Sequence, residues 1–204
     1  AMTTVLTPGG LNYGRIDRLD TALQGYATKR GRVIVDYPQA ANAGSILTGE
    51  QQLDRNARAL VKVNQPFEIV ASSMGAEVVS LWLENHADKP DAPSPALLQR
   101  IILLGNPCRR EGGVVTAGNW ITKQGFLGKR RPTPETQYRT DDIARFGDRW
   151  ANADRHPGGT LDLNWIERII DRFRDPHTYY DHVDPERPGV LRARSGNTCY
   201  WVSG

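Results

Sequence analysis

Cysteine is scarce in this sequence of 204 residues, which contains only Cys108 and Cys199. A chain of this length can bury a stable core without a disulfide, so we expect both thiols to be free. An excess of charge of one sign is also lacking, because 26 basic residues face 23 acidic ones and the basic ones are scattered along the chain. The net charge of +3 gives no reason to expect a nucleic-acid partner.

Long apolar runs are missing as well. No window approaches the ~20 apolar residues of a membrane-spanning helix, so we expect no transmembrane segment. The first residues, AMTTVLTPGG, have neither the basic start nor the apolar stretch of a signal peptide. We therefore expect a soluble protein that folds as one domain over residues 1–204 and whose oligomeric state the sequence leaves open.

The sequence does contain short apolar segments that alternate with amphipathic ones. Five segments are candidate strands: residues 3–7, 32–37, 67–72, 100–104 and 142–146. Four of them have the β-branched or Leu-rich composition of short buried strands. Strands that alternate with helices are typical of an α/β protein with helices on both faces of a parallel sheet. We predict a central, mainly parallel five-stranded sheet flanked by helices.

Apolar residues at spacings of three and four predict the helices between these strands. The predicted helices cover about residues 16–26, 48–61, 74–86 and 161–173. Thr48 and Gln51 have the spacing of a capping box, which predicts that the second helix begins there. Residues 105–140 are Gly-rich with little periodicity and are predicted to be a long loop, either a substrate or lid-like loop or an irregular surface. Residues 199–202 are predicted to be an edge strand.

The sharpest functional signal lies where the strand at 67–72 meets the following helix. There the run Ala71-Ser72-Ser73-Met74-Gly75 places a serine between small residues two positions before and two positions after it. This spacing is typical of a nucleophile elbow, with Ala71 where a glycine usually stands. Such a turn directs the serine Oγ and the helix N-terminus toward the carboxyl edge of the sheet. We predict that Ser73 is a nucleophile; an ordinary strand–turn–helix connection is the alternative.

A nucleophilic serine needs a histidine base and an orienting carboxylate. In folds with a nucleophile elbow the carboxylate, Asp or Glu, follows the serine in the chain, and the histidine comes last. His177 and His182 come after the last predicted helix, and His177 is the preferred base. Asp148 is the preferred carboxylate, because it follows the strand at 142–146 and would lie at the carboxyl edge of the sheet. The other carboxylates considered are Asp141, Asp142 and Asp154, and the other two histidines, judged poorer, are His86 and His156.

The loop after the first strand is expected to supply an oxyanion donor. Thr7-Pro8-Gly9-Gly10 contains consecutive glycines, which let a backbone N–H approach a substrate oxygen. We predict an oxyanion hole made by the N–H groups of Gly10 and Met74. Four apolar residues of the long loop are candidates for contact with an acyl chain, or equally for packing over the core: Trp120, Ile121, Phe126 and Leu127.

Taken in order, these segments resemble the cutinase-like esterases and, within them, the lysin B proteins of mycobacteriophages. The elbow stands in place of their Gly-Tyr-Ser-Gln-Gly, and Gly147-Asp148-Arg149-Trp150 is similar to their Gly-Asp-x-aromatic catalytic loop. Three more segments are similar to their Val-x-Tyr-Pro-Ala, Gly-Asn-Pro and base-carrying His-x-x-Tyr segments, namely Val35-Asp36-Tyr37-Pro38-Gln39-Ala40, Leu104-Gly105-Asn106-Pro107 and His177-Thr178-Tyr179-Tyr180. The likeness extends from about residue 3 to about residue 182.

The resemblance implies an α/β-hydrolase that cleaves esters through a Ser-His-Asp triad and an acyl-enzyme, with no metal or cofactor. For the lysin B proteins the substrate is the ester between mycolic acids and arabinogalactan in the mycobacterial cell wall. The resemblance thus implies a phage-encoded protein made in the host cytoplasm that acts on the cell envelope in lysis. The sequence departs from the family on both sides of Ser73. A general short-chain carboxylesterase, and a cell-wall-binding or phage tail module with the same fold, are the alternatives.

Overall fold

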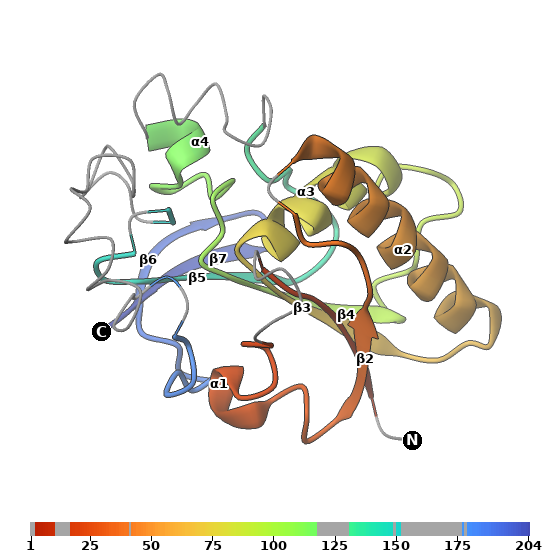
Figure 1. Cartoon of the computed structure of the whole chain (residues 1–204), viewed down its shortest axis with the longest axis horizontal. Helices are drawn as coiled ribbons and strands as arrows, with labels where there is room; N and C mark the ends of the chain where they lie inside the picture. The colour runs from red at the N-terminus through yellow and green to blue at the C-terminus, as the bar shows by residue number, and fades with distance from the viewer. Residues whose placement is uncertain are drawn as a thin grey trace.

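A seven-stranded sheet forms the centre of the computed structural model (Figure 1), which describes residues 3–10, 17–40, 42–117, 131–148, 150–151, 177 and 179–204. The strand order is β2-β1-β3-β4-β5-β7-β6, and neighbouring strands are parallel except for β6 and β7, which are antiparallel. The strands are β1 (Thr4–Pro8), β2 (Gly31–Val35), β3 (Phe67–Ser72), β4 (Leu98–Leu104), β5 (Thr140–Arg145), β6 (Val190–Ser195) and β7 (Thr198–Ser203).

The α/β class and the mainly parallel sheet are confirmed, but the predicted number of five strands is wrong. The five predicted segments correspond to β1 to β5, with ends that shift by at most two residues. β6 escaped prediction because it carries Arg192 and Arg194 and is almost entirely exposed, so it has no apolar run. β7, predicted as an edge strand, lies inside the sheet between β5 and β6.

The helices among the described residues are α1 (Ala22–Gly25), α2 (Ala43–Lys62), α3 (Met74–His86) and α4 (Val114–Ala117). α3 has the predicted bounds. α2 begins earlier than predicted, because the side chain of Asn42 caps it by accepting a hydrogen bond from the N–H of Ser45 at 2.8 Å. The capping box at Thr48 is therefore wrong: Thr48 lies inside the helix, and its hydroxyl donates to the carbonyl of Gly44 at 2.9 Å. The predicted helix at 161–173 lies outside the described residues.

The predicted helix at 16–26 is reduced to the four residues of α1. Leu23 and Gln24 have left-handed φ values of 56° and 58°, and their N–H groups donate to the carbonyls of Tyr180 and Asp181 instead of continuing a helix. The apolar residues that the structure describes there are nevertheless buried, including Leu19, which is 1% exposed. The spacing of these residues thus predicted correctly that they are buried, but it predicted a helix where the chain is mostly irregular.

Two apolar clusters cover the two faces of the sheet. One joins β3 and β4 to α2 and α3, and the other joins the opposite face to α1 and Tyr180. Figure 1 shows α2 and α3 on one side of the sheet and α1 on the other. The strands β1, β3, β4 and β5 are therefore largely buried, and the loops at the carboxyl ends of such parallel strands are where α/β proteins place their functional groups. Cys108 is buried and Cys199 is half-buried, and no disulfide joins them. None of the helices in the described ranges combines the length and apolarity needed to cross a membrane.

Candidate active site

Ser73 lies in a strained turn between β3 and α3. Its φ of 52° and ψ of −120° are uncommon for a residue with a side chain, and such strain is concentrated at functional sites. The turn requires small neighbours: a Cβ on Gly75 would lie 2.1 Å from the carbonyl oxygen of Pro8. Ala71 on the other side is fully buried. The chain thus forms the elbow that the sequence predicted, with Ser73 at the carboxyl end of β3.

The structure brings Ser73, His177 and Asp148 together. Ser73 Oγ lies 2.7 Å from His177 Nε2, and His177 Nδ1 lies 2.9 Å and 3.1 Å from Asp148 Oδ1 and Oδ2. His177 is 8% exposed and Asp148 is fully buried. An ionised carboxylate only accepts hydrogen bonds, so His177 Nδ1 carries the proton and the lone pair of Nε2 faces the serine hydroxyl.

Asp148 is surrounded by hydrogen-bond donors. Its Oδ1 accepts from the N–H groups of Trp150 and Ala151 at 2.9 Å and 3.1 Å, and its Oδ2 accepts from the hydroxyl of Tyr180 at 2.8 Å. Burial alone would raise the pKa of Asp148, but the charge and hydrogen bond of His177 and the bonds from Tyr180 and Ala151 outweigh it and hold the pKa below its ordinary value. The carboxylate therefore stays ionised beside the imidazole.

Three residues near the triad were not assigned a role from the sequence. A Cβ on Gly105, whose φ is +57°, would lie 2.9 Å from His177 Nδ1 and 3.0 Å from Asp148 Oδ2, so only glycine leaves room for their hydrogen bond. Tyr180 donates to Asp148, and the ring of Trp150 lies 6.0 Å from that of His177. The glycine directly after β4 was a usable signal, because it lies at the same edge of the sheet as Ser73.

The loop after β1 lies directly against the serine. A Cβ on Gly10 would be 3.0 Å from Ser73 Cβ, so a glycine here lets the loop approach the serine closely without a tight contact. Met74 is the first residue of α3, and the N–H groups of a helix's first turn have no partner within the helix. The residue as a whole is 1% exposed, and its side chain packs in the apolar core.

The alternative candidates lie elsewhere or outside the described residues. His182 is exposed, and its Nε2 lies 3.2 Å from the carbonyl of Gly204. His86 lies at the far end of α3 with its Nε2 2.7 Å from Glu50. Asp141 and Asp142 bind the guanidinium groups of Arg100 and Arg109 instead of an imidazole. The residues that lie outside the described ranges are Asp154, His156, Trp120, Ile121, Phe126 and Leu127.

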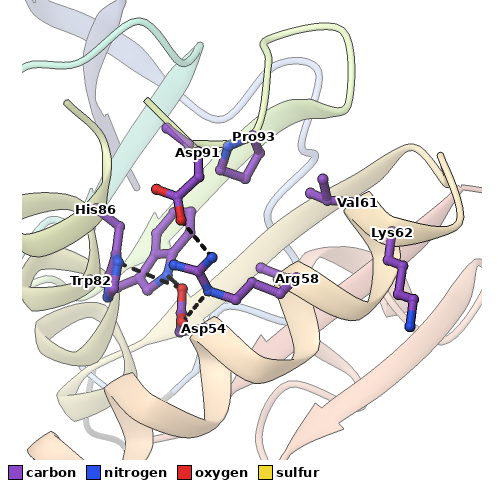
Figure 2. Close-up of a pocket in the computed structure, with 10 residues that line it drawn as sticks. Asp54, Arg58, Val61, Lys62, Trp82, His86, Asp91 and Pro93 are labelled. Carbon is purple, nitrogen blue, oxygen red and sulfur yellow. Dashed lines mark hydrogen bonds and ion pairs between the residues drawn. The ribbon is translucent and has the colours of Figure 1, made fainter. Parts of the chain in front are cut away.

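A separate cavity of about 220 Å³ lies between α2, α3 and the segment before β4 (Figure 2). The guanidinium of Arg58 bridges Asp54 and Asp91 at its wall, with hydrogen bonds of 2.6 Å and 2.7 Å. Neither Ser73 nor His177 lines this cavity, which is smaller than the ~300 Å³ at which ligand pockets usually begin. Within the described ranges, no group of three or more His, Cys, Asp or Glu residues could hold a metal ion.

One protein family and several solved structures are similar to this chain. The model of a family described as the PE-PPE domain matches residues 25–201. A cutinase-like protein from Cryptococcus sp. has a TM-score of 0.50 at 15% identity, over 89% of this chain and 87% of that one. Lysin B from mycobacteriophage D29 has a TM-score of 0.48 at 20% identity, over 84% and 72%. A carboxylesterase from Mesorhizobium loti has a TM-score of 0.47 at 11% identity, over 100% and 80%. No curated protein matches the sequence. At these identities, the cutinase-like structure shows the α/β-hydrolase fold.

Proposed function

The chain belongs to the PE-PPE domain family, and we propose that it is a serine esterase in which Ser73 attacks the ester, His177 is the base and Asp148 orients that base. The observation that carries the proposal is the 2.7 Å hydrogen bond between Ser73 Oγ and His177 Nε2, at a strained turn and backed by a buried carboxylate. Nucleophile, base and orienting group within hydrogen-bond reach are the arrangement that activates a serine.

The proposed reaction transfers the acyl group twice, first from the ester to Ser73 and then from Ser73 to water. Ser73 Oγ forms a bond to the ester carbonyl carbon while its proton passes to His177 Nε2, and His177 then gives that proton to the leaving alcohol oxygen. A water molecule attacks the resulting acyl-enzyme in the same way, and its proton passes through His177 back to Ser73 Oγ. Asp148 stays ionised throughout and stabilises the positively charged imidazole. The carbonyl oxygen carries the developing negative charge in both steps.

We propose that this oxyanion is held by the N–H groups of Met74 and Gly10. Met74 opens α3, whose N-terminus carries a partial positive charge, and Gly10 lies against Ser73, since a Cβ on it would be 3.0 Å from Ser73 Cβ. A donor of this kind contributes about 3 kcal/mol to transition-state stabilisation in related enzymes. Because the Met74 side chain is buried, the loss of the glutamine found in the lysin B elbow leaves the backbone donor in place.

For the substrate, we propose a lipid ester of the mycobacterial cell wall, with mycolic acid esters as the specific case. The support is the sequence resemblance to the lysin B proteins, which would make the protein phage-encoded and active at the envelope. We also propose that the whole chain forms a single domain and that the loop around 105–140 contributes to substrate binding.

The proposal is tested by labelling with a fluorophosphonate, which reacts only with an activated serine. We expect one labelled residue, located at Ser73 by mass spectrometry, and no labelling of Ser73→Ala. The matched control is Ser72→Ala, which removes the neighbouring hydroxyl and keeps the label. A correctly folded protein that takes no label would contradict the esterase and favour a cell-wall-binding module with the same fold.

A further inference from the structure

Tyr37 lies behind the loop that approaches Ser73. It follows β2, is 6% exposed, and its hydroxyl donates a hydrogen bond to the carbonyl oxygen of Gly9. That oxygen also lies over α3, because a Cβ on Gly75 would be 2.7 Å from it. The Gly9 carbonyl is therefore directed into the protein, between the tyrosine hydroxyl and the first turn of the helix.

The Gly9 carbonyl and the Gly10 N–H are the two ends of one peptide group. A peptide group is planar, and in its trans form the C=O and N–H bonds point in opposite directions. This chain contains no cis peptide bonds among its described residues. A hydrogen bond that fixes the direction of the Gly9 carbonyl therefore also fixes the direction of the Gly10 N–H, which points away from Tyr37.

The ring of Tyr37 is itself held in place. A Cβ on Gly49 of α2 would lie 2.9 Å from the ring carbon Cδ2 and 2.8 Å from Val78 Cγ2 of α3, so the ring fills the space that this glycine leaves. Burial, with a smaller contribution from the charge of Glu77, raises the pKa of Tyr37 well above its ordinary value. The hydroxyl thus keeps its proton and remains a donor at every working pH.

We infer that Tyr37 is a positioning residue of the oxyanion hole, which orients the Gly10 N–H toward the substrate oxygen by holding the other end of the same peptide group. This inference rests on the proposed esterase function. A second effect acts in the same direction: a hydrogen bond accepted by the carbonyl polarises the peptide and makes its N–H a stronger donor. Tyr37 touches no reacting atom and acts only through Gly9 and Gly10.

The test compares Tyr37→Phe with Tyr138→Phe. Tyr138 is the matched control, because it is also buried and its hydroxyl also donates to a backbone carbonyl, that of Pro93 at 2.8 Å, on a segment that does not contact the site. Removing an oxyanion donor outright costs about 10²–10³ in kcat, so loosening one should cost about tenfold. We expect that loss in kcat for Tyr37→Phe with KM nearly unchanged, and no loss for Tyr138→Phe.

Two further measurements separate positioning from a general loss of structure. A trifluoromethyl ketone forms a tetrahedral adduct with an oxyanion, and its affinity for Tyr37→Phe should fall by the same factor as kcat/KM. Hydrogen exchange of a peptide covering residues 3–10 should become faster in Tyr37→Phe and stay unchanged in Tyr138→Phe. Gly49→Ala keeps the hydroxyl but displaces the ring, and should reproduce both changes in weaker form.

The outcomes distinguish this inference from the proposed function. If the wild-type protein hydrolyses esters through Ser73 but Tyr37→Phe retains full kcat, full affinity for the ketone and unchanged exchange over residues 3–10, the role of Tyr37 is wrong and the esterase stands. If the wild-type protein shows no hydrolysis that depends on Ser73, the proposed function is wrong and the role of Tyr37 falls with it.

Discussion

Asp142 and Asp148 belong to the same short stretch of chain and are 1% and 0% exposed. Their carboxylates accept hydrogen bonds from different kinds of donor. Asp142, on β5, accepts from Arg109 at 3.0 Å and from the side-chain amide of Asn106 at 2.9 Å. Asp148, just beyond the strand, accepts from an imidazole, a phenol and two backbone N–H groups. The cost of burying the carboxylate is therefore offset by a cation and an amide at Asp142, and by an imidazole, a hydroxyl and two backbone N–H groups at Asp148.

The consequence is a difference in acidity. Burial raises the pKa of Asp142 above its ordinary value even though Arg109 and Asn106 oppose it. For Asp148 the opposing interactions win and the pKa is lowered. Asp142 anchors Arg109, whose other hydrogen bonds reach the carbonyls of Glu111 and Trp201, so the pair fastens the loop after β4 to β7. These contacts agree with the proposed role of Asp148 in orienting His177, and they place Asp142 in the framework that holds Arg109.

Exchanging each aspartate for asparagine should separate these roles most sharply. Asp148→Asn should lower kcat by about 10⁴-fold, because an amide no longer holds the imidazole in the productive tautomer or stabilises its charged form. Asp142→Asn should keep kcat within about tenfold, since its side chain does not contact His177 in the interactions described. Steady-state kinetics on the two folded variants measures both kcat values. Equal losses of kcat in the two variants would contradict different roles for the two aspartates.

Removing the Arg109 guanidinium should lower the stability of the fold. Arg109→Met leaves Asp142 buried and without its cation, which we expect to lower the free energy of unfolding by about 3–5 kcal/mol. The double variant Arg109→Met with Asp142→Asn should recover part of this loss, because the unpaired charge is gone. Urea denaturation of the three variants gives the coupling free energy; strict additivity would mean that the pair is not coupled.

Tyr180 is expected to influence Asp148 without touching the substrate. Tyr180→Phe removes the donor to Oδ2, so the pKa of Asp148 should rise toward its ordinary value and kcat/KM should fall about tenfold. The acidic limb of the pH–rate profile should move to higher pH. Tyr179→Phe is the matched control, because the Tyr179 hydroxyl accepts from Arg18 and does not reach Asp148. A Tyr180→Phe profile that coincides with the wild type would exclude this role.

The two aspartates should change the free energy of unfolding with pH in opposite directions. Because the pKa of Asp148 is lowered below 3.8, its contribution to stability is complete above that pH and is lost as the pH falls through the folded-state pKa. Because the pKa of Asp142 is raised, its contribution is present below 3.8 and is lost as the pH rises through the folded-state pKa. The free energy of unfolding of the two asparagine variants should be measured between about pH 2.5 and 7. Each variant should lose the pH dependence that its own aspartate contributes, and identical curves for the two variants would contradict the opposite pKa shifts.

The parts of the fold that the sequence predicted well are those fixed by neighbouring residues. The run from β3 through Ser73 to α3 has its expected bounds, because apolar strand, small residues and helix follow one another directly. The choice of His177 and Asp148 depended on the order of elements in the fold, and the structure places His177 against Ser73 and Asp148 against His177. Their catalytic roles remain predictions.

The parts that escaped prediction depend on distant partners. α1 is irregular because its N–H groups bond to Tyr180 and Asp181, far along the chain, and no local pattern encodes that. β6 is an exposed edge without an apolar run. Tyr37 and Tyr180 owe their proposed roles to single hydroxyl contacts with Gly9 and Asp148, which spacing alone does not reveal.

Hydrolysis of p-nitrophenyl esters from acetate to palmitate, by the wild-type protein and by Ser73→Ala, tests the central claim most directly. The account predicts turnover that is lost in Ser73→Ala without a change in folding, with a preference for long acyl chains if the substrate is a lipid of the cell wall. Turnover that survives in Ser73→Ala, or a folded wild-type protein that hydrolyses none of these esters, would contradict it.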